Sequence, residues 1–363
     1  MTVEQVKEET FKLIDALKAT CQQYGMGNDG NEYKIITQVF LYKFLNDKFC
    51  FEVKKLNSPI VKKILSAESF EVGYASLRDD DRLDVLIRDR SKQTPLPYKY
   101  IHKGGDSKEC IDVVILAEGY TAEQMDIFME DAIATKKEIL SYQPFISYTE
   151  KFNFIAVMSP SVDSNVSVPQ ACDWRDTAVS SNFMTFYMAR YLTSSNVYDM
   201  YDLVTNIPCE HFRILANTNT YGGGGIYNSY TLTTAHHPDF RPVVVHEFGH
   251  SFAGLGDEYF YDNDDDNDNM HSLNHEPWEP NITTLVDFDS KWADMLPYGI
   301  EVPTTVTPER TANYTVGLYE GGGYLSKGIY RPANVCRMRN NTAERFCPVC
   351  ERAIEKVILH QAR

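Results

Sequence analysis

Apolar residues in the first part of the chain recur with helical spacing. In "MTVEQVKEETFKLIDALKAT" they share one stripe, and Thr2 with Gln5 forms a capping box at the start. In "NEYKIITQVFLYKFLNDKF" they recur every four residues, after the turn-rich "GMGNDGN". This pattern predicts a small helical segment over residues 1–85.

The pattern changes after residue 85, where short apolar runs alternate with helical stretches. Residues 113–116, 151–158 and 211–218 are typical of buried strands, and a helix is expected from Thr121, with Gln124 as its capping partner. The alternation predicts an α/β domain with a mixed sheet in the rest of the chain, 86–363.

A run of four glycines, 222–225, precedes a Tyr- and Thr-rich strand. It lacks the Gly-Lys-Ser/Thr ending of a phosphate-binding loop, and no helix start follows it. We therefore interpret the run as a flexible turn or rim.

Composition and charge narrow the function classes. The 363 residues are 43% hydrophobic and 24% charged, which is typical of a folded globular protein. The net charge of -16 disfavours broad binding to nucleic acids or anionic membranes. The charged, amphipathic N-terminus has neither the apolar core of a secretion signal nor the length of a membrane span, so we expect no membrane span and no export signal in the chain as written.

The stretch "VVVHEFGHSFAGLGDEYF" carries the strongest chemical signal. Pro242 fits the first turn of a helix, and on that helix His246 and His250 share one face, so both imidazoles can bind one Zn²⁺ ion. Glu247 lies on the flank, where it can act as general base on a water molecule without binding the metal. The spacing resembles that of zincin metallopeptidases.

The third metal ligand must come from beyond this helix. On an unbroken helix Asp257 would lie about 10 Å along the axis from His250, so the helix has to end first, which Gly254 and Gly256 permit. Zincins with the motif HExxHxxGxxD use the aspartate as ligand. The spacing here is one residue longer, so Asp257 is the favoured ligand and Glu258 the alternative, either as ligand or as a support behind the ligands.

Several segments in a preserved order resemble the IgA-peptidase family of zinc metallopeptidases. Among them are "GIYNSYTLTTAHHPDFRPVVVHEFGHSFAGLGDEY", "YEGGGY", "KGIYRPANVCRMRNN" and "FCPVCERAI", and the resemblance runs from about residue 85 to the end. It implies a zincin-type catalytic domain that acts on protein or peptide, with His246 and His250 as zinc ligands and Glu247 as base. It also implies that Met338 forms an apolar floor beneath the metal, with an ordinary core methionine as the alternative.

The N-terminal segment carries a different resemblance. "GNEYKIITQVFLYKFLNDKF" is similar to the N-terminal helical domain of type I restriction-modification methyltransferase subunits. The Asn-Pro-Pro motif of their methylase domain does not occur in this chain, so methylation is not expected. Members of the IgA-peptidase family are usually secreted or on the cell surface, and carry a signal and a β-rich domain where this segment stands.

Three cysteines lie close together near the C-terminus: Cys336, Cys347 and Cys350. With His360 they would meet the tetrahedral count of a second metal site, and they could also form a disulfide. We favour a structural role near the active-site helix over a metal site.

The run "DNDDDNDN", residues 262–269, offers the oxygen ligands that Ca²⁺ prefers, but it lacks the glycine and terminal glutamate of an EF-hand. We interpret it as a solvated loop, with Ca²⁺ binding as the alternative.

These patterns favour a zinc metalloendopeptidase with Zn²⁺ as its cofactor. Two alternatives are a non-catalytic zinc-containing binding module and a restriction-system adaptor. Glu247 favours the enzyme over the first alternative, because a purely structural zinc needs no neighbouring base. The missing methylase motif counts against the second alternative.

Overall fold

The computed structural model describes residues 11–12, 14–19, 94–261 and 271–362. The chain divides into two units, residues 1–89 and 90–363, and each is considered by itself. In the first unit, residues 11–12 and 14–19 are helical. The rest of the expected helical segment and its boundary near residue 85 lie outside the described residues, so they stay predictions.

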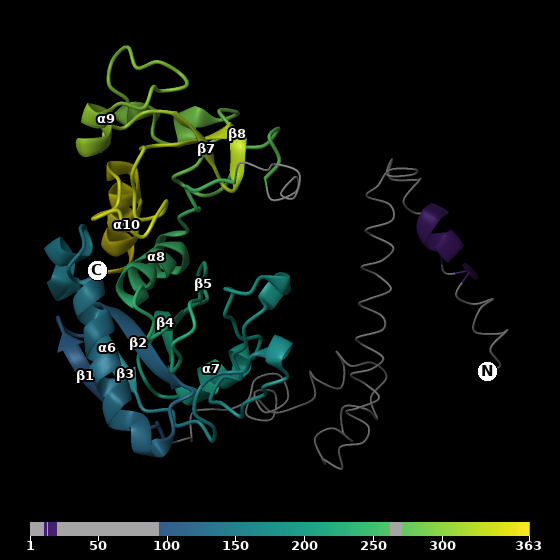
Figure 1. The fold of residues 1–363 in the computed structure, drawn as a ribbon, viewed down its shortest axis with the longest axis vertical. Coiled ribbons are helices and arrows are strands. Elements are labelled where there is room, and N and C mark those ends of the chain that lie inside the picture. Colours follow the sequence, from purple (N-terminus) through teal and green to yellow (C-terminus); the bar gives the residue numbers. More distant parts are fainter. Residues whose placement is uncertain (1–10, 13, 20–93, 262–270, 363) are drawn as a thin grey trace, which may run out of the picture. The chain divides into compact units, whose positions relative to one another are not determined.

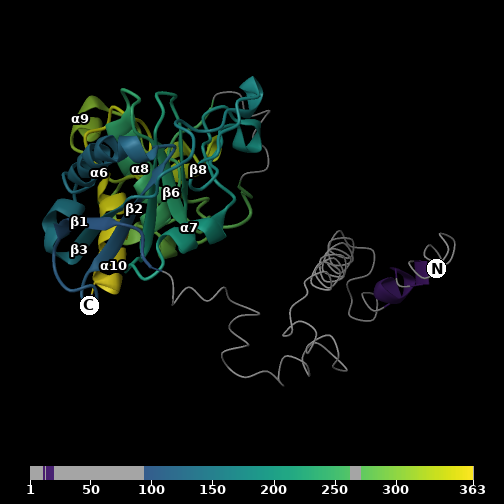
Figure 2. The same cartoon turned by 90° about the horizontal axis from the view of Figure 1, so that it is seen from below.

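The second unit is built on a mixed six-stranded sheet, as the sequence predicts. Its strand order is β1-β3-β2-β4-β6-β5, with β2, β3, β4 and β6 parallel and the two edge strands antiparallel. The strands are β1 (Tyr98–Lys103), β2 (Ile111–Glu118), β3 (Phe152–Val157), β4 (His211–Ala216), β5 (Gly223–Ile226) and β6 (Tyr230–Thr234) (Figure 1, and Figure 2 for β6).

The parallel strands are buried throughout because both faces of the sheet are covered. Val113 and Ile115 pack in a core with α6 (Met125–Ile139), α8 (Phe240–Ala253) and α10 (Pro348–Gln361). Their neighbours Val114 and Leu116 point to the opposite face, where they pack in a second core with α7 (Val197–Leu203) and the segment before it (Figure 2). The first of these cores holds α8 against the sheet, where the helix contacts β5 and β6.

The capping box predicted at Thr121 is confirmed. The Gln124 side chain accepts a hydrogen bond of 3.0 Å from the Thr121 backbone N–H, and a short 3-10 turn, Ala122–Gln124, leads into α6. The other 3-10 segments among the described residues are Phe145–Lys151, Pro169–Ala171, Thr185–Tyr187, Phe288–Ser290 and Ala293–Met295.

The glycine run, interpreted as a flexible turn or rim, is an edge strand and not a turn. Residues 223–225 belong to strand β5 at the sheet edge. A Cβ atom on Gly225 would lie 2.3 Å from the backbone oxygen of Glu247 and 2.8 Å from Cβ of His250. Glycine is therefore needed so that the strand can approach α8, and this tertiary contact outweighs the low strand propensity of glycine.

The chain after α8 forms a smaller region with α9 (Pro308–Ala312) and the hairpin of β7 (Tyr319–Gly322) and β8 (Leu325–Arg331) (Figure 1). The acidic run 262–269 lies outside the described residues. Among the described parts of the chain, no helix has the length and apolar character needed to cross a membrane.

Candidate metal centre

Helix α8 presents two histidines to the same point. His246 and His250 lie one turn apart, and their Nε2 atoms are 3.0 Å from each other. Pro242 lies in the first turn of this helix, as expected. The helical spacing predicted from the sequence therefore brings both imidazoles together.

The helix ends at Gly254, which adopts the left-handed conformation with φ of +64°. The Gly254 N–H donates a 3.0 Å hydrogen bond to the His250 carbonyl, and the Leu255 N–H donates one of 3.3 Å to the Gly249 carbonyl. This closure turns the chain back along the helix, as the two glycines in the sequence suggest. It returns Asp257 to the histidines.

The Asp257 carboxylate completes a group of three. Its Oδ1 atom lies 3.0 Å from Nε2 of His246 and 3.3 Å from Nε2 of His250. Its other oxygen, Oδ2, accepts a hydrogen bond from the hydroxyl of Tyr324. The three side chains are largely buried, and their ligand atoms all lie close together.

The hydrogen bonds of the two histidines leave their Nε2 atoms able to bind a metal ion. Nδ1 of His246 lies 3.0 Å from the Arg337 carbonyl oxygen, and Nδ1 of His250 lies 2.5 Å from that of Leu255. Each Nδ1 must carry a hydrogen to make this bond, so in the neutral ring Nε2 keeps its lone pair. The separations of 3.0 to 3.3 Å are close to the edge of about 3.3 Å in a tetrahedron of ligands bound at 2.0–2.1 Å.

The pKa values of His250 and Asp257 are shifted by their proximity to each other. Burial alone lowers the pKa of His250, but the Asp257 carboxylate, the hydrogen bonds to it and Glu247 raise this pKa to about 9. Burial likewise raises the pKa of Asp257, and the two histidines outweigh it and hold the pKa well below its ordinary value. Without a metal, the carboxylate therefore stabilises a proton on the neighbouring imidazole.

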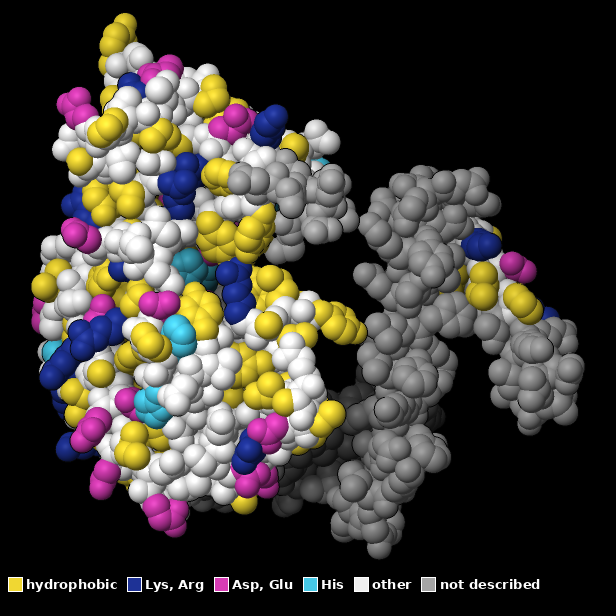
Figure 3. All heavy atoms as spheres, viewed as in Figure 1, with side chains coloured by type: hydrophobic (Ala, Val, Ile, Leu, Met, Phe, Trp, Pro, Cys, Tyr) yellow, Lys and Arg dark blue, Asp and Glu magenta, His cyan; other side chains and the backbone are white. Residues whose placement is uncertain are grey.

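Glu247 lies beside these ligands at an open cleft. A Cβ atom on Gly223 would lie 3.1 Å from Oε1 of Glu247, so the carboxylate faces the edge strand β5. The cleft has a volume of about 780 Å³, and the three metal-site residues, Glu247 and the glycines of β5 all line it. Figure 3 shows hydrophobic and basic side chains gathered around hollows on this face of the protein.

Met338 lies on the inner side of the helix. It is fully buried, and a Cβ atom on Gly249 would be 2.8 Å from its sulfur. The preceding residue, Arg337, supplies the carbonyl that orients His246. Met338 thus packs directly against the helix between the two histidines, and its role as a floor beneath a metal stays a prediction.

Glu258, the alternative acid, points elsewhere. It is fully buried, and its carboxylate accepts a 2.9 Å hydrogen bond from the side chain of Asn281. Its ligand atoms group with three cysteines and not with the histidines. Of these two adjacent acids, only Asp257 reaches the histidine group.

Sequence reasoning missed the polar side chains that surround the group. Tyr324 contacts Asp257, and the Arg190 guanidinium donates hydrogen bonds of 2.9 Å to the hydroxyls of Tyr259 and Tyr261. All four line the cleft. Tyr259 and Tyr324 lie in the quoted segments "GLGDEY" and "YEGGGY", but residues so far apart in sequence carry no spacing signal that would place them together.

Comparison with known families settles the identity of this second unit. The profile of the family IgA peptidase M64 matches residues 100–313 and 306–358. The chain belongs to the IgA peptidase M64 family. The match covers the α8 histidines, Asp257 and the cysteine segment, which confirms the resemblance found in the sequence. No curated protein matches the chain.

Membership of IgA peptidase M64, a metallopeptidase family, makes the protein a peptidase, so its substrates are proteins or peptides. The match does not reach residues 1–99, so the similarity of the N-terminal segment to methyltransferase subunits stays a prediction.

Proposed function

We propose that the protein is a zincin-type, zinc-dependent endopeptidase in which His246, His250 and Asp257 hold the metal and Glu247 is the general base. One observation carries this proposal: three ligand atoms converge beside a glutamate that lines an open cleft. The ligand set of two imidazoles and one carboxylate is one that zinc prefers in catalytic sites.

The chain's own residues supply the proton transfers. When bound, zinc lowers the pKa of water and polarises the scissile carbonyl. Glu247 accepts a proton from the attacking water and delivers it to the nitrogen of the departing amine. Tyr324 and the carbonyls of Arg337 and Leu255 keep the metal-binding side chains in fixed orientations during these steps.

The shape of the surroundings supports cleavage within a chain. A second hollow of about 220 Å³ shares His250, Asp257 and Tyr324 with the main cleft and is also lined by Trp278. Two hollows that share the metal-site residues would accommodate a peptide that extends beyond the scissile bond. This arrangement favours an endopeptidase over an enzyme that removes terminal residues.

The experiment uses the full chain and a mixed library of peptides with blocked termini. We expect mass spectrometry to show internal cleavage that is lost on treatment with a chelator and restored by Zn²⁺. Cleavage that survives complete metal removal would contradict the metal dependence. Release of single terminal residues from an unblocked library, with no internal cleavage of the blocked one, would contradict the endopeptidase assignment.

A non-catalytic zinc-containing module is the weaker alternative, because the Glu247 carboxylate lines the cleft beside the ligands. The restriction-system adaptor depends on the N-terminal segment, most of which lies outside the described residues. The same library experiment separates both alternatives from a peptidase.

A further inference from the structure

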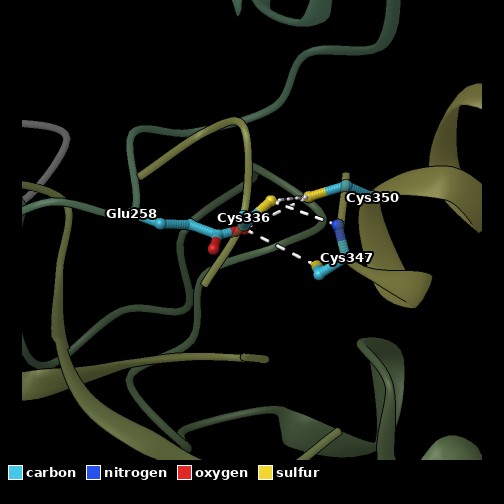
Figure 4. Close-up of side chains that lie close together, drawn as sticks. All are labelled: Glu258, Cys336, Cys347 and Cys350. Atoms are coloured by element: carbon cyan, nitrogen blue, oxygen red, sulfur yellow. Dashed lines mark hydrogen bonds between the residues drawn. The ribbon is translucent and has the colours of Figure 1, made fainter. Parts of the chain in front are cut away.

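A second group of potential metal ligands lies away from the histidines. It consists of Glu258, Cys336, Cys347 and Cys350, and all four side chains are buried from solvent. Figure 4 shows the carboxylate of Glu258 and the three thiols pointing toward a common centre. One ligand atom from each lies within 4.8 Å of all the others.

Three separate segments build this group. Glu258 directly follows Asp257, Cys336 lies in the loop after β8, and the two remaining cysteines begin α10. Cys347 is the N-cap of α10 and Cys350 lies in its first turn, so both sulfurs lie at the helix N-terminus. The helix dipole there stabilises thiolates, the form in which cysteine binds metals.

The distances agree with a tetrahedral metal site. Sγ of Cys336 and Sγ of Cys350 are 3.8 Å apart. A tetrahedron with zinc–sulfur bonds of about 2.3 Å has edges of about 3.8 Å, whereas a disulfide has sulfurs about 2.05 Å apart. Oε1 of Glu258 lies 3.1 Å from Sγ of Cys350 and 3.8 Å from Sγ of Cys347. In a zinc tetrahedron the distance between a sulfur and an oxygen ligand is about 3.5 Å, which lies between these two values.

The polar groups of the cluster are only partly satisfied by protein. Oε2 of Glu258 is buried and has no hydrogen-bond partner. The sulfur of Cys336 accepts hydrogen bonds of 3.4 Å and 3.3 Å from the backbone N–H groups of Met338 and Cys347. Backbone donors to a sulfur are common around metal-bound thiolates, and a buried carboxylate without a cation is costly.

We propose that Glu258, Cys336, Cys347 and Cys350 bind a second zinc ion with a structural role. Three thiolates and one carboxylate fill the four positions of tetrahedral zinc, and a closed, buried site of this kind leaves no place for a substrate. Thiolates also select zinc over Mg²⁺ and Ca²⁺, which prefer oxygen ligands. The buried Arg331 has a favourable electrostatic interaction with Glu258 and offsets part of the excess negative charge.

This site would tie together the segments that build the catalytic group. The Glu258 N–H donates a 2.9 Å hydrogen bond to the Met338 carbonyl, and Arg337, next to it, orients His246. A metal bound here fixes Asp257 through its neighbour and attaches both loops to α10. The proposal does not depend on the chemistry at Glu247.

In the structure the fourth member of the cysteine group is Glu258, and not His360 as considered from the sequence. His360 is exposed, and it lies ten residues after Cys350 on α10, a rise of about 15 Å. The carboxylate of Glu258 takes that place because the turn after α8 directs it toward the start of α10. No spacing in the sequence connects these two segments.

The test counts zinc in the purified full chain by elemental analysis. We expect two zinc ions per chain in the unchanged protein and one in the double variant His246→Ala/His250→Ala. X-ray absorption of that double variant should show sulfur neighbours at about 2.3 Å from the remaining zinc. Cys350→Ser should lose the second zinc, whereas Cys172→Ser, which changes an exposed free cysteine, should keep both.

Two results would overturn the proposal. One is a histidine double variant that holds no zinc, or holds a zinc without sulfur neighbours. The other is a disulfide, which would remove two of the eight cysteines from the thiols titrated after denaturation with chelator. The absorption measurement needs no cysteine variant, so it decides the question even where Cys350→Ser fails to fold.

Discussion

The hydroxyl of Tyr324 donates a hydrogen bond to Oδ2 of Asp257, and Oδ1 of the same carboxylate is left facing both histidines. Removing the hydroxyl in Tyr324→Phe should free the carboxylate to rotate and lower zinc affinity about 10- to 100-fold, the usual cost of losing such a partner. Competition with a chromophoric chelator measures this affinity. Tyr261→Phe is the matched control, because its hydroxyl accepts a hydrogen bond from Arg190 and its ring stacks on Tyr324. Equal affinities in the two variants would refute the orienting role.

Asp257 itself should matter more than its partner. Asp257→Asn keeps the shape of the side chain and removes the charge. We expect zinc affinity at the histidine site to fall by more than about 100-fold, which is the upper end of the loss for residues that only hydrogen-bond to a metal ligand. Asp239→Asn, at the exposed start of the same helix, serves as control and should bind zinc normally. Unchanged zinc affinity in Asp257→Asn would contradict its place as third ligand.

Gly225 allows the edge strand to contact α8, since a Cβ atom there would lie 2.3 Å from the Glu247 carbonyl oxygen. Gly225→Ala should reduce the free energy of unfolding by about 1–3 kcal/mol, as overpacking does, and should displace the helix that carries the site. Urea denaturation measures the free energy of unfolding. A lower rate of peptide cleavage would report the displacement of the helix. Gly322→Ala is the control, because its Cβ would meet neighbours only at 3.6 Å and beyond. Equal free energies of unfolding in the two variants would show that the contact between β5 and α8 does not require glycine at position 225.

Metal binding should release a proton that His250 carries in the metal-free protein. Burial lowers the pKa of this group, but Asp257 and Glu247 raise it to about 9. The ring is therefore mostly protonated at pH 7.5, and zinc must displace about one proton per ion at the histidine site. The release falls as pH rises through about 9, so zinc affinity increases up to that pH. Calorimetry in buffers of different ionisation enthalpy measures the proton count, with Cys350→Ser to isolate the histidine site. Release of no proton at pH 7.5 would contradict the raised pKa.

The sequence predicted the features that depend on local spacing. Two histidines four residues apart on a helix must share a face, and Gly254 marks where that helix ends. The sequence therefore predicted the pairing of the histidines, and it favoured Asp257 as their partner with Glu258 as the alternative. The strand role of the glycine run did not follow, because it depends on contact with α8. The grouping of Glu258 with the cysteines and of Tyr324 with Asp257 joins distant segments, and no local pattern encodes such contacts.

The most direct test of the peptidase account is the rate of peptide cleavage by Glu247→Gln, measured alongside its zinc content. Glutamine keeps the shape of the side chain but cannot accept the proton from water, so we predict normal zinc content and a rate at least about 100-fold lower. Glu123→Gln, at an exposed position before α6, controls for the loss of one negative charge. A zinc-loaded Glu247→Gln protein that cleaves peptides as fast as the unchanged chain would contradict the assignment of Glu247 as the base.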